Sequence, residues 1–173
     1  MSEKTWLRRI FDLAVEMNNV LLLDRLENDL RSGVATLEEL GLTEAEFKSA
    51  LRNCHREMAA RLFLAARDGN DFACFVNCEQ MVNASGLAPI DIETTPEEFR
   101  RVRRTCYIAS ARFFYDLAAR RKWTDVFRRD RRRGERLRWF ELAAERLREG
   151  DLTFDDIRVS QLEAVELHAS LIM

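Results

Sequence analysis

Residues 43–67, TEAEFKSALRNCHREMAARLFLAAR, decide the fold class. Thr43 followed three residues later by Glu46 is the capping-box arrangement that begins a helix. Apolar residues then recur at three- and four-residue steps, the period of a helix with one core-facing side. These residues are Phe47, Ala50, Leu51, Cys54, Met58, Leu62 and Ala65. Strong turn formers follow at residues 68–71, DGND, so the sequence predicts a long helix over residues 44–67.

The same features occur again 52 residues later, at Thr95-Pro96-Glu97-Glu98-Phe99. Thr95 is the predicted cap, and Pro96 takes the first helical position, where its missing N–H is not needed. A second shift of 52 residues places YDLA at 115–118 over FDLA at 11–14. Thr153, 58 residues after Thr95, begins a weaker third copy with Asp in place of Glu. We therefore predict an internal repeat whose last unit carries extra residues.

These patterns predict an all-α fold of stacked helical hairpins, a repeat-like bundle of about seven to eight helices. We expect a single domain over residues 1–173, built from two-helix units of about 52 residues at 5–42, 43–94 and 95–152 and a C-terminal helix at 153–170. Residues 86–95 form the longest predicted connector. The predicted helices cover residues 5–17, 20–32, 36–40, 44–67, 72–85, 96–121, 124–133, 135–149 and 154–170.

The composition indicates a folded chain in water. Of the 173 residues 47% are hydrophobic and 34% are charged, so the chain is too apolar for a disordered protein. The longest aliphatic run, residues 20–23, is far shorter than the ~20 residues that cross a bilayer. The first residues lack the apolar core of a signal peptide. We expect a soluble, cytoplasmic protein without a membrane partner.

The net charge of −2 hides a strong asymmetry along the chain. Residues 1–99 carry a net −8, residues 100–138 a net +11, and residues 139–173 a net −5. The basic block suits an acidic protein partner, a second copy of the chain, or the acidic segments of its own chain. Its densest part predicts a partner-binding face made of Arg128, Arg129, Arg131, Arg132, Arg133, Arg136 and Arg138.

Nucleic acid is the alternative partner for the basic block. Arginines there could bind phosphates, and interleaved aromatic rings could stack on bases. The isoelectric point of about 5.8 counts against a dedicated nucleic-acid-binding protein. The predicted contacts are Arg100, Arg101, Arg103, Arg104, Trp123 and Trp139.

The four cysteines are candidates for a thiol-based metal or redox site. Cys74 and Cys78 share a helix face, while Cys54 and Cys106 occupy equivalent positions of the predicted repeat. Four converging thiolates could bind Zn²⁺ or Cu(I). Each cysteine also falls on an apolar stripe, where a free thiol packs as a small hydrophobic side chain. We therefore expect no metal and no cofactor.

The sequence contains no catalytic signature. It has two histidines, His55 and His168, and lacks the GxSxG, P-loop, GxGxxG and HExxH motifs. We therefore expect a non-enzymatic protein, a helical interaction, adaptor or regulatory module with an arginine-rich face. Nucleic-acid binding and thiol chemistry remain the alternatives.

Overall fold

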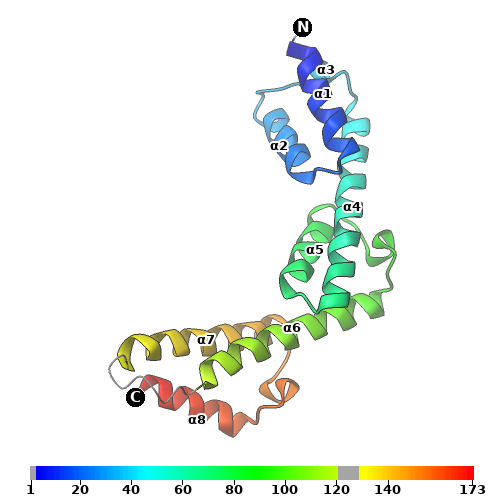
Figure 1. Cartoon of the computed structure of the whole chain (residues 1–173). Coiled ribbons are helices and arrows are strands. Elements are labelled where there is room, and N and C mark those ends of the chain that lie inside the picture. Colours follow the sequence, from blue (N-terminus) through cyan, green and yellow to red (C-terminus); the bar gives the residue numbers. More distant parts are fainter. Residues whose placement is uncertain (1–2, 121–128) are drawn as a thin grey trace. The chain divides into compact units, whose positions relative to one another are not determined.

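The structure, a computed structural model, describes the backbone of residues 3–120 and 129–173 and the side chains of residues 6–120 and 133–173. Every regular element in this described part is helical, which confirms the predicted all-α class (Figure 1). In chain order the elements are α1 (Glu3–Glu16), α2 (Val20–Arg31), α3 (Leu37–Leu40), α4 (Glu44–Gly69), α5 (Phe72–Ala84), η1 (Pro89–Ile92), α6 (Pro96–Ala119), α7 (Arg129–Glu149), η3 (Phe154–Ile157) and α8 (Gln161–Ile172).

Capping boxes begin α4, where the sequence predicts one, and α8, where it does not. At α4 the Thr43 hydroxyl accepts the backbone N–H of Glu46 at 3.2 Å, and the Glu46 carboxylate accepts the N–H of Thr43 at 2.8 Å. Ser160 and Glu163 form the same box at the start of α8. Each box satisfies two N–H groups that a helix start leaves without an intrahelical partner.

Two of the predicted helix breaks are confirmed. Asn18, between α1 and α2, and Asn70, between α4 and α5, adopt positive φ angles of 48° and 50°. Asparagine tolerates this left-handed conformation better than most residues, so both positions end one helix and admit the next. The third predicted break, at Lys122 and Trp123, lies outside the described residues.

A four-residue helical turn, with a left-handed residue on each side, precedes three of the helices. In chain order, each turn with its two left-handed residues is Gly33, α3 and Gly41; Gly86, η1 and Glu93; and Asp151, η3 and Arg158. The second of these sets lies within the predicted connector 86–95. The stacking of the hairpins as repeats stays a prediction.

The prediction of one C-terminal helix over residues 153–170 was wrong. Thr153 caps η3 through Asp156, Arg158 ends that turn with a φ of 58°, and α8 begins only after Ser160. Ser160, 65 residues after Thr95, therefore precedes the C-terminal helix, where the sequence predicts Thr153. The sequence does not show this difference, because Thr153 and Ser160 are both good cap residues. In addition, Arg158 follows this turn, whereas Gly41 follows the first one.

An arginine ties a preceding helix to the turn in the first and third sets. Arg8 of α1 donates from Nη1 to the Leu40 carbonyl at 3.3 Å, and Arg112 of α6 donates from Nη1 to the Ile157 carbonyl at 2.7 Å. Each carbonyl is the last of its turn, so the two arginines make equivalent caps on helix C-termini.

The predicted break between helices at 124–133 and 135–149 was also wrong. Helix α7 runs without interruption from Arg129 to Glu149, and Gly134 lies inside it. A single glycine costs a helix about 1 kcal/mol, which the rest of a long helix can offset. Residues 124–128 of the predicted helix lie outside the described part.

The contacts form two compact units. The N-terminal unit comprises residues 1–65 and 76–96, and the C-terminal unit comprises residues 66–75 and 97–173. In the N-terminal unit α1 packs against α2 and α3. Its core is a cluster of buried side chains, the largest of which are Phe11, Leu23, Leu40, Phe47 and Leu51.

The core of the C-terminal unit is aromatic. The Phe72 ring meets Tyr107 edge-on at 4.9 Å, and Phe140 stacks on Phe154 at 5.7 Å and on His168 at 4.9 Å. Helix α8 packs against α7 in this unit, with Ala164 and Leu171 of α8 buried.

Candidate binding groove

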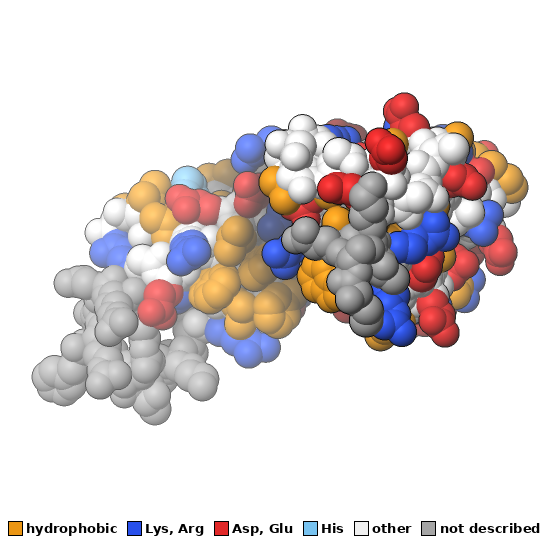
Figure 2. Space-filling view, turned by 90° about the horizontal axis from the view of Figure 1, so that it is seen from above, with side chains coloured by type: hydrophobic (Ala, Val, Ile, Leu, Met, Phe, Trp, Pro, Cys, Tyr) orange, Lys and Arg blue, Asp and Glu red, His pale blue; other side chains and the backbone are white. Residues whose placement is uncertain are grey.

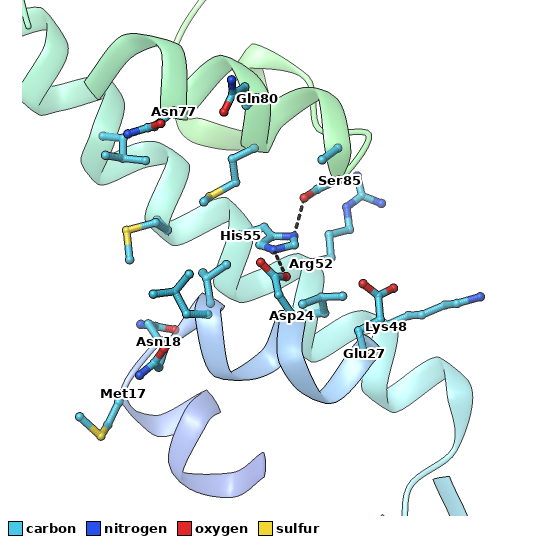
Figure 3. A pocket seen from close by; sticks show the side chains of 18 of the residues that line it. Met17, Asn18, Asp24, Glu27, Lys48, Arg52, His55, Asn77, Gln80 and Ser85 are labelled. Atoms are coloured by element: carbon cyan, nitrogen blue, oxygen red, sulfur yellow. Dashed lines mark hydrogen bonds and ion pairs between the residues drawn. The ribbon is translucent and has the colours of Figure 1, made fainter. Parts of the chain in front are cut away.

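A groove of about 1060 Å³ lies in the N-terminal unit, along α4 between α2 and α5 (Figure 3). Its lining comes from segments that are distant in the sequence. The groove has a polar centre, an apolar end and a charged end.

The polar centre is a chain of three side chains around His55 of α4. His55 Nε2 lies 3.0 Å from Asp24 Oδ1, and Nδ1 lies 2.5 Å from Ser85 Oγ (Figure 3). A carboxylate only accepts hydrogen bonds, so in the neutral ring Nε2 carries the hydrogen and Nδ1 accepts the Ser85 hydroxyl. The His55 side chain is only 12% exposed, so this bridge holds α2 and the end of α5 on α4.

The order Ser85–His55–Asp24 is that of a nucleophile, a base and an orienting carboxylate. Acyl transfer also needs N–H donors that stabilise an oxyanion. The backbone N–H groups of Ser85, Gly86 and Leu87 already donate to carbonyls of the preceding turn of α5. The hydrogen bonds of this turn therefore favour a positioning role for the three side chains.

The apolar end of the groove is rich in methionine. Met17 is 62% exposed and Leu21 is 82% exposed, while Met58 and Met81 are partly buried beside them. Amide side chains, including Asn77 and Gln80, border this end (Figure 3). Methionine is flexible and polarizable, which suits a surface that adapts to another apolar side chain.

The charged end carries the cations Arg31, Lys48 and Arg52 and the carboxylate Glu27. The three cations are 71%, 70% and 58% exposed, and they pair with Glu27, Glu44 and Asp91, which are 29%, 67% and 36% exposed. Ion pairs this exposed contribute little stability, so a charged ligand can replace them.

Two arginines of the predicted face form hydrogen bonds with backbone carbonyls of their own unit. Arg133 Nε donates to the Leu171 carbonyl of α8 at 3.0 Å, and Arg136 Nε donates to the Ala118 carbonyl of α6 at 2.7 Å. Cations in these places stabilise the negative ends of helices. Arg138 is exposed. Arg129, Arg131 and Arg132 belong to α7 but their side chains, like the whole of Arg128, lie outside the described part.

The predicted nucleic-acid contacts are also engaged within the C-terminal unit. Arg100 and Arg101 pair with Glu97 and Glu98. Arg103 donates to a carbonyl of α7 and lies over the Tyr107 ring, and Arg104 pairs with Asp156. The Trp139 ring stacks on Phe114, and Trp123 lies outside the described residues. On the face drawn in Figure 2, basic and acidic side chains are interspersed.

All four cysteines are free thiols, and Cys74 is the one that is not fully buried. Among the described residues no three His, Cys, Asp or Glu side chains are grouped to hold an ion. Cys54 and Cys78 belong to the N-terminal unit, and Cys74 and Cys106 to the C-terminal unit. Burial raises the pKa of Cys78 to about 12 and that of Cys106 to about 11.

Sequence reasoning missed the groove. It found no convergent titratable groups, yet the fold brings Asp24, His55 and Ser85 together from three segments. One signal was present: Lys48, Arg52 and His55 follow helical spacing, which marks a polar second face of α4. Nothing local to residues 24 or 85 indicates that they meet this face.

Comparisons with models of protein families, with curated proteins and with solved structures found no match. In the part of the chain that the structure describes, no helix combines the length and apolar character needed to cross a membrane.

Proposed function

We propose that this protein is a non-enzymatic interaction module that binds one amphipathic helical segment of a protein partner in the groove of its N-terminal unit. The observation that supports the proposal is the division of the groove into an exposed apolar end and an end with three exposed cations. An amphipathic helix meets such a groove with its apolar stripe.

The apolar end supplies the contact area. Leu21 and Met17 remain largely exposed, although α1 and α2 bury Phe11, Leu23 and Leu26 in the core beside them. Exposed apolar side chains that line a hollow indicate a binding surface more than singly scattered ones do. A partner side chain that enters here would remove both from water.

The charged end supplies orientation. Arg31, Lys48 and Arg52 already pair with carboxylates of their own unit, so an acidic residue of the partner would bind this end by replacing one of these exposed ion pairs. The sequence predicts an acidic partner for a different surface, the basic block of residues 100–138. The arginine face remains a second proposed contact, carried by exposed Arg138 and by the arginines whose side chains lie outside the described part.

Arg100, Arg101 and Arg104 pair with carboxylates as the groove cations do, so the isoelectric point of about 5.8 is what favours a protein partner over nucleic acid. The exposed carboxylate of Glu97 beside Arg100 would repel a phosphate. Nucleic acid therefore stays the alternative for the basic block and not the primary proposal.

The experiment is selection from a displayed library of amphipathic helical peptides, followed by binding measurements with Leu21→Glu. Leu21 lies in the first turn of α2, where an acidic residue is tolerated, so the variant should fold. The matched control is Leu13→Glu, which changes a 49% exposed leucine outside the groove.

We expect the selected peptides to bind the wild type and Leu13→Glu equally and to lose at least tenfold in affinity for Leu21→Glu. Equal binding to Leu21→Glu would place the site elsewhere. A selection that yields no binding peptide would reject the proposed function.

A further inference from the structure

Helix α8 carries an apolar stripe that the described residues of its own unit leave exposed. Leu162 is 67% exposed, Val165 54% and Ile172 63%, and half-buried Ala169 lies between them. Steps of three, four and three residues place these side chains on one side of the helix. Ala164 and Leu171, on the other side, are buried. The helix therefore has one face packed in its unit and a second face suited to another surface.

Residues of the stripe occupy the same positions, counted from the helix cap, as residues of α4 that line the groove. Ser160 caps α8 as Thr43 caps α4. Counted from these caps, Val165 and Ile172 take the positions of Lys48 and His55, which line the groove in the N-terminal unit. The face that is polar and hollowed along α4 is thus apolar along α8.

The charges of α8 complement the groove. Residues 161–173 contain Glu163 and Glu166 and no lysine or arginine. Glu166 is exposed, beside Val165 of the stripe. An aliphatic stripe suits the methionine-rich end of the groove, and Glu166 would replace one of the exposed carboxylates that pair with Arg31, Lys48 or Arg52.

We infer that α8 of one molecule binds in the N-terminal groove of a second copy, so that the chain associates head to tail. The inference rests on the proposed function of the groove and names its occupant. The stripe would meet Met17 and Leu21, and Glu166 would face the cationic end. The donor and acceptor surfaces differ, so each dimer keeps one free groove and one free α8 and can grow further.

The test is sedimentation velocity on the full-length chain across about a hundredfold range of concentration. The donor variant is Val165→Glu with Ile172→Glu, and the acceptor variant is Leu21→Glu. All three positions are exposed, and circular dichroism checks that each variant is folded. Leu13→Glu serves as the control that should associate like the wild type.

We expect the wild type to grow beyond a dimer as its concentration rises, and each variant alone to stay monomeric. An equimolar mixture of the two variants should form a heterodimer and stop there, because it retains one intact groove and one intact α8. Association of Leu21→Glu alone would indicate a different interface, such as α8 against α8, and would overturn the inference.

A wild type that stays monomeric at every concentration would also overturn it. If library peptides still bind the groove in that case, self-association fails while the proposed function stands. If neither occurs, both fail, so the two experiments separate the outcomes.

Discussion

At the scale of single residues, His55 connects the fold to the groove. Its two ring nitrogens bond side chains from two other segments, so the imidazole is both a structural bridge and the floor of the groove. In the sequence, His55 is only an isolated histidine next to Cys54. The bridge becomes visible only when residues 24, 55 and 85 meet in space.

Removing the Ser85 hydroxyl should weaken this bridge. We expect Ser85→Ala to lower the free energy of unfolding by about 1 kcal/mol, because His55 Nδ1 loses its donor while largely buried. Urea denaturation measures the change, with exposed Ser49→Ala as the control. Equal stability of Ser85→Ala and the wild type would show that the short contact contributes nothing.

The thiols should differ in reactivity. Burial raises the pKa of Cys78 to about 12 and that of Cys106 to about 11, so almost no thiolate forms on either at pH 8. Cys74 is the half-buried thiol. In native protein treated with Ellman's reagent we expect Cys74 to react first and Cys78 and Cys106 only after unfolding. Rapid native labelling of Cys78, located by mass spectrometry, would contradict this.

At the scale of helices, caps set the boundaries, and the sequence shows most of them. Thr43 and Glu46 predict the start of α4 correctly, and asparagines predict the breaks at residues 18 and 70. The third turn escapes prediction because Arg158 adopts the conformation that Gly41 adopts in the first. A left-handed arginine has no signature in the sequence.

The capping box of α4 should make stability depend on pH. Hydrogen bonds from Thr43 lower the pKa of Glu46 below its ordinary value of 4.5. A lowered pKa in the folded state stabilises the protein above the unfolded value, and this stabilisation is lost as the pH falls through the folded value. We expect the wild type to melt above Glu46→Gln at pH 7 and the difference to vanish toward pH 3. A difference that is constant with pH would contradict the assignment.

The arginines of α7 should separate into structural and free ones. Arg136 donates to the last turn of α6 at 2.7 Å, whereas Arg138 is exposed. We expect Arg136→Gln to lower the free energy of unfolding by about 1–3 kcal/mol, as for a charged hydrogen bond, and Arg138→Gln to change it little. Thermal melts compare the two variants, and equal loss in both would reject the distinction.

At the scale of the whole chain, the sequence predicts the helical class but not the site. Apolar periodicity and caps are local, so they can be read from one segment at a time. The groove depends on packing between residues that are far apart in the sequence. The basic block predicts a binding face, but two of its described arginines, Arg133 and Arg136, cap the ends of helices. The sequence predicts a C-terminal helix, but not which of its faces the fold buries.

The central claim, that the groove of the N-terminal unit is the binding site, can be measured through methionine methyl groups. The chain has five methionines, and Met17, Met58 and Met81 line the groove. With ¹³C-methyl methionine and a selected helical peptide, we predict saturable NMR shifts of these three resonances while Met1 stays unchanged. Saturable binding that leaves all three groove resonances in place would contradict the account.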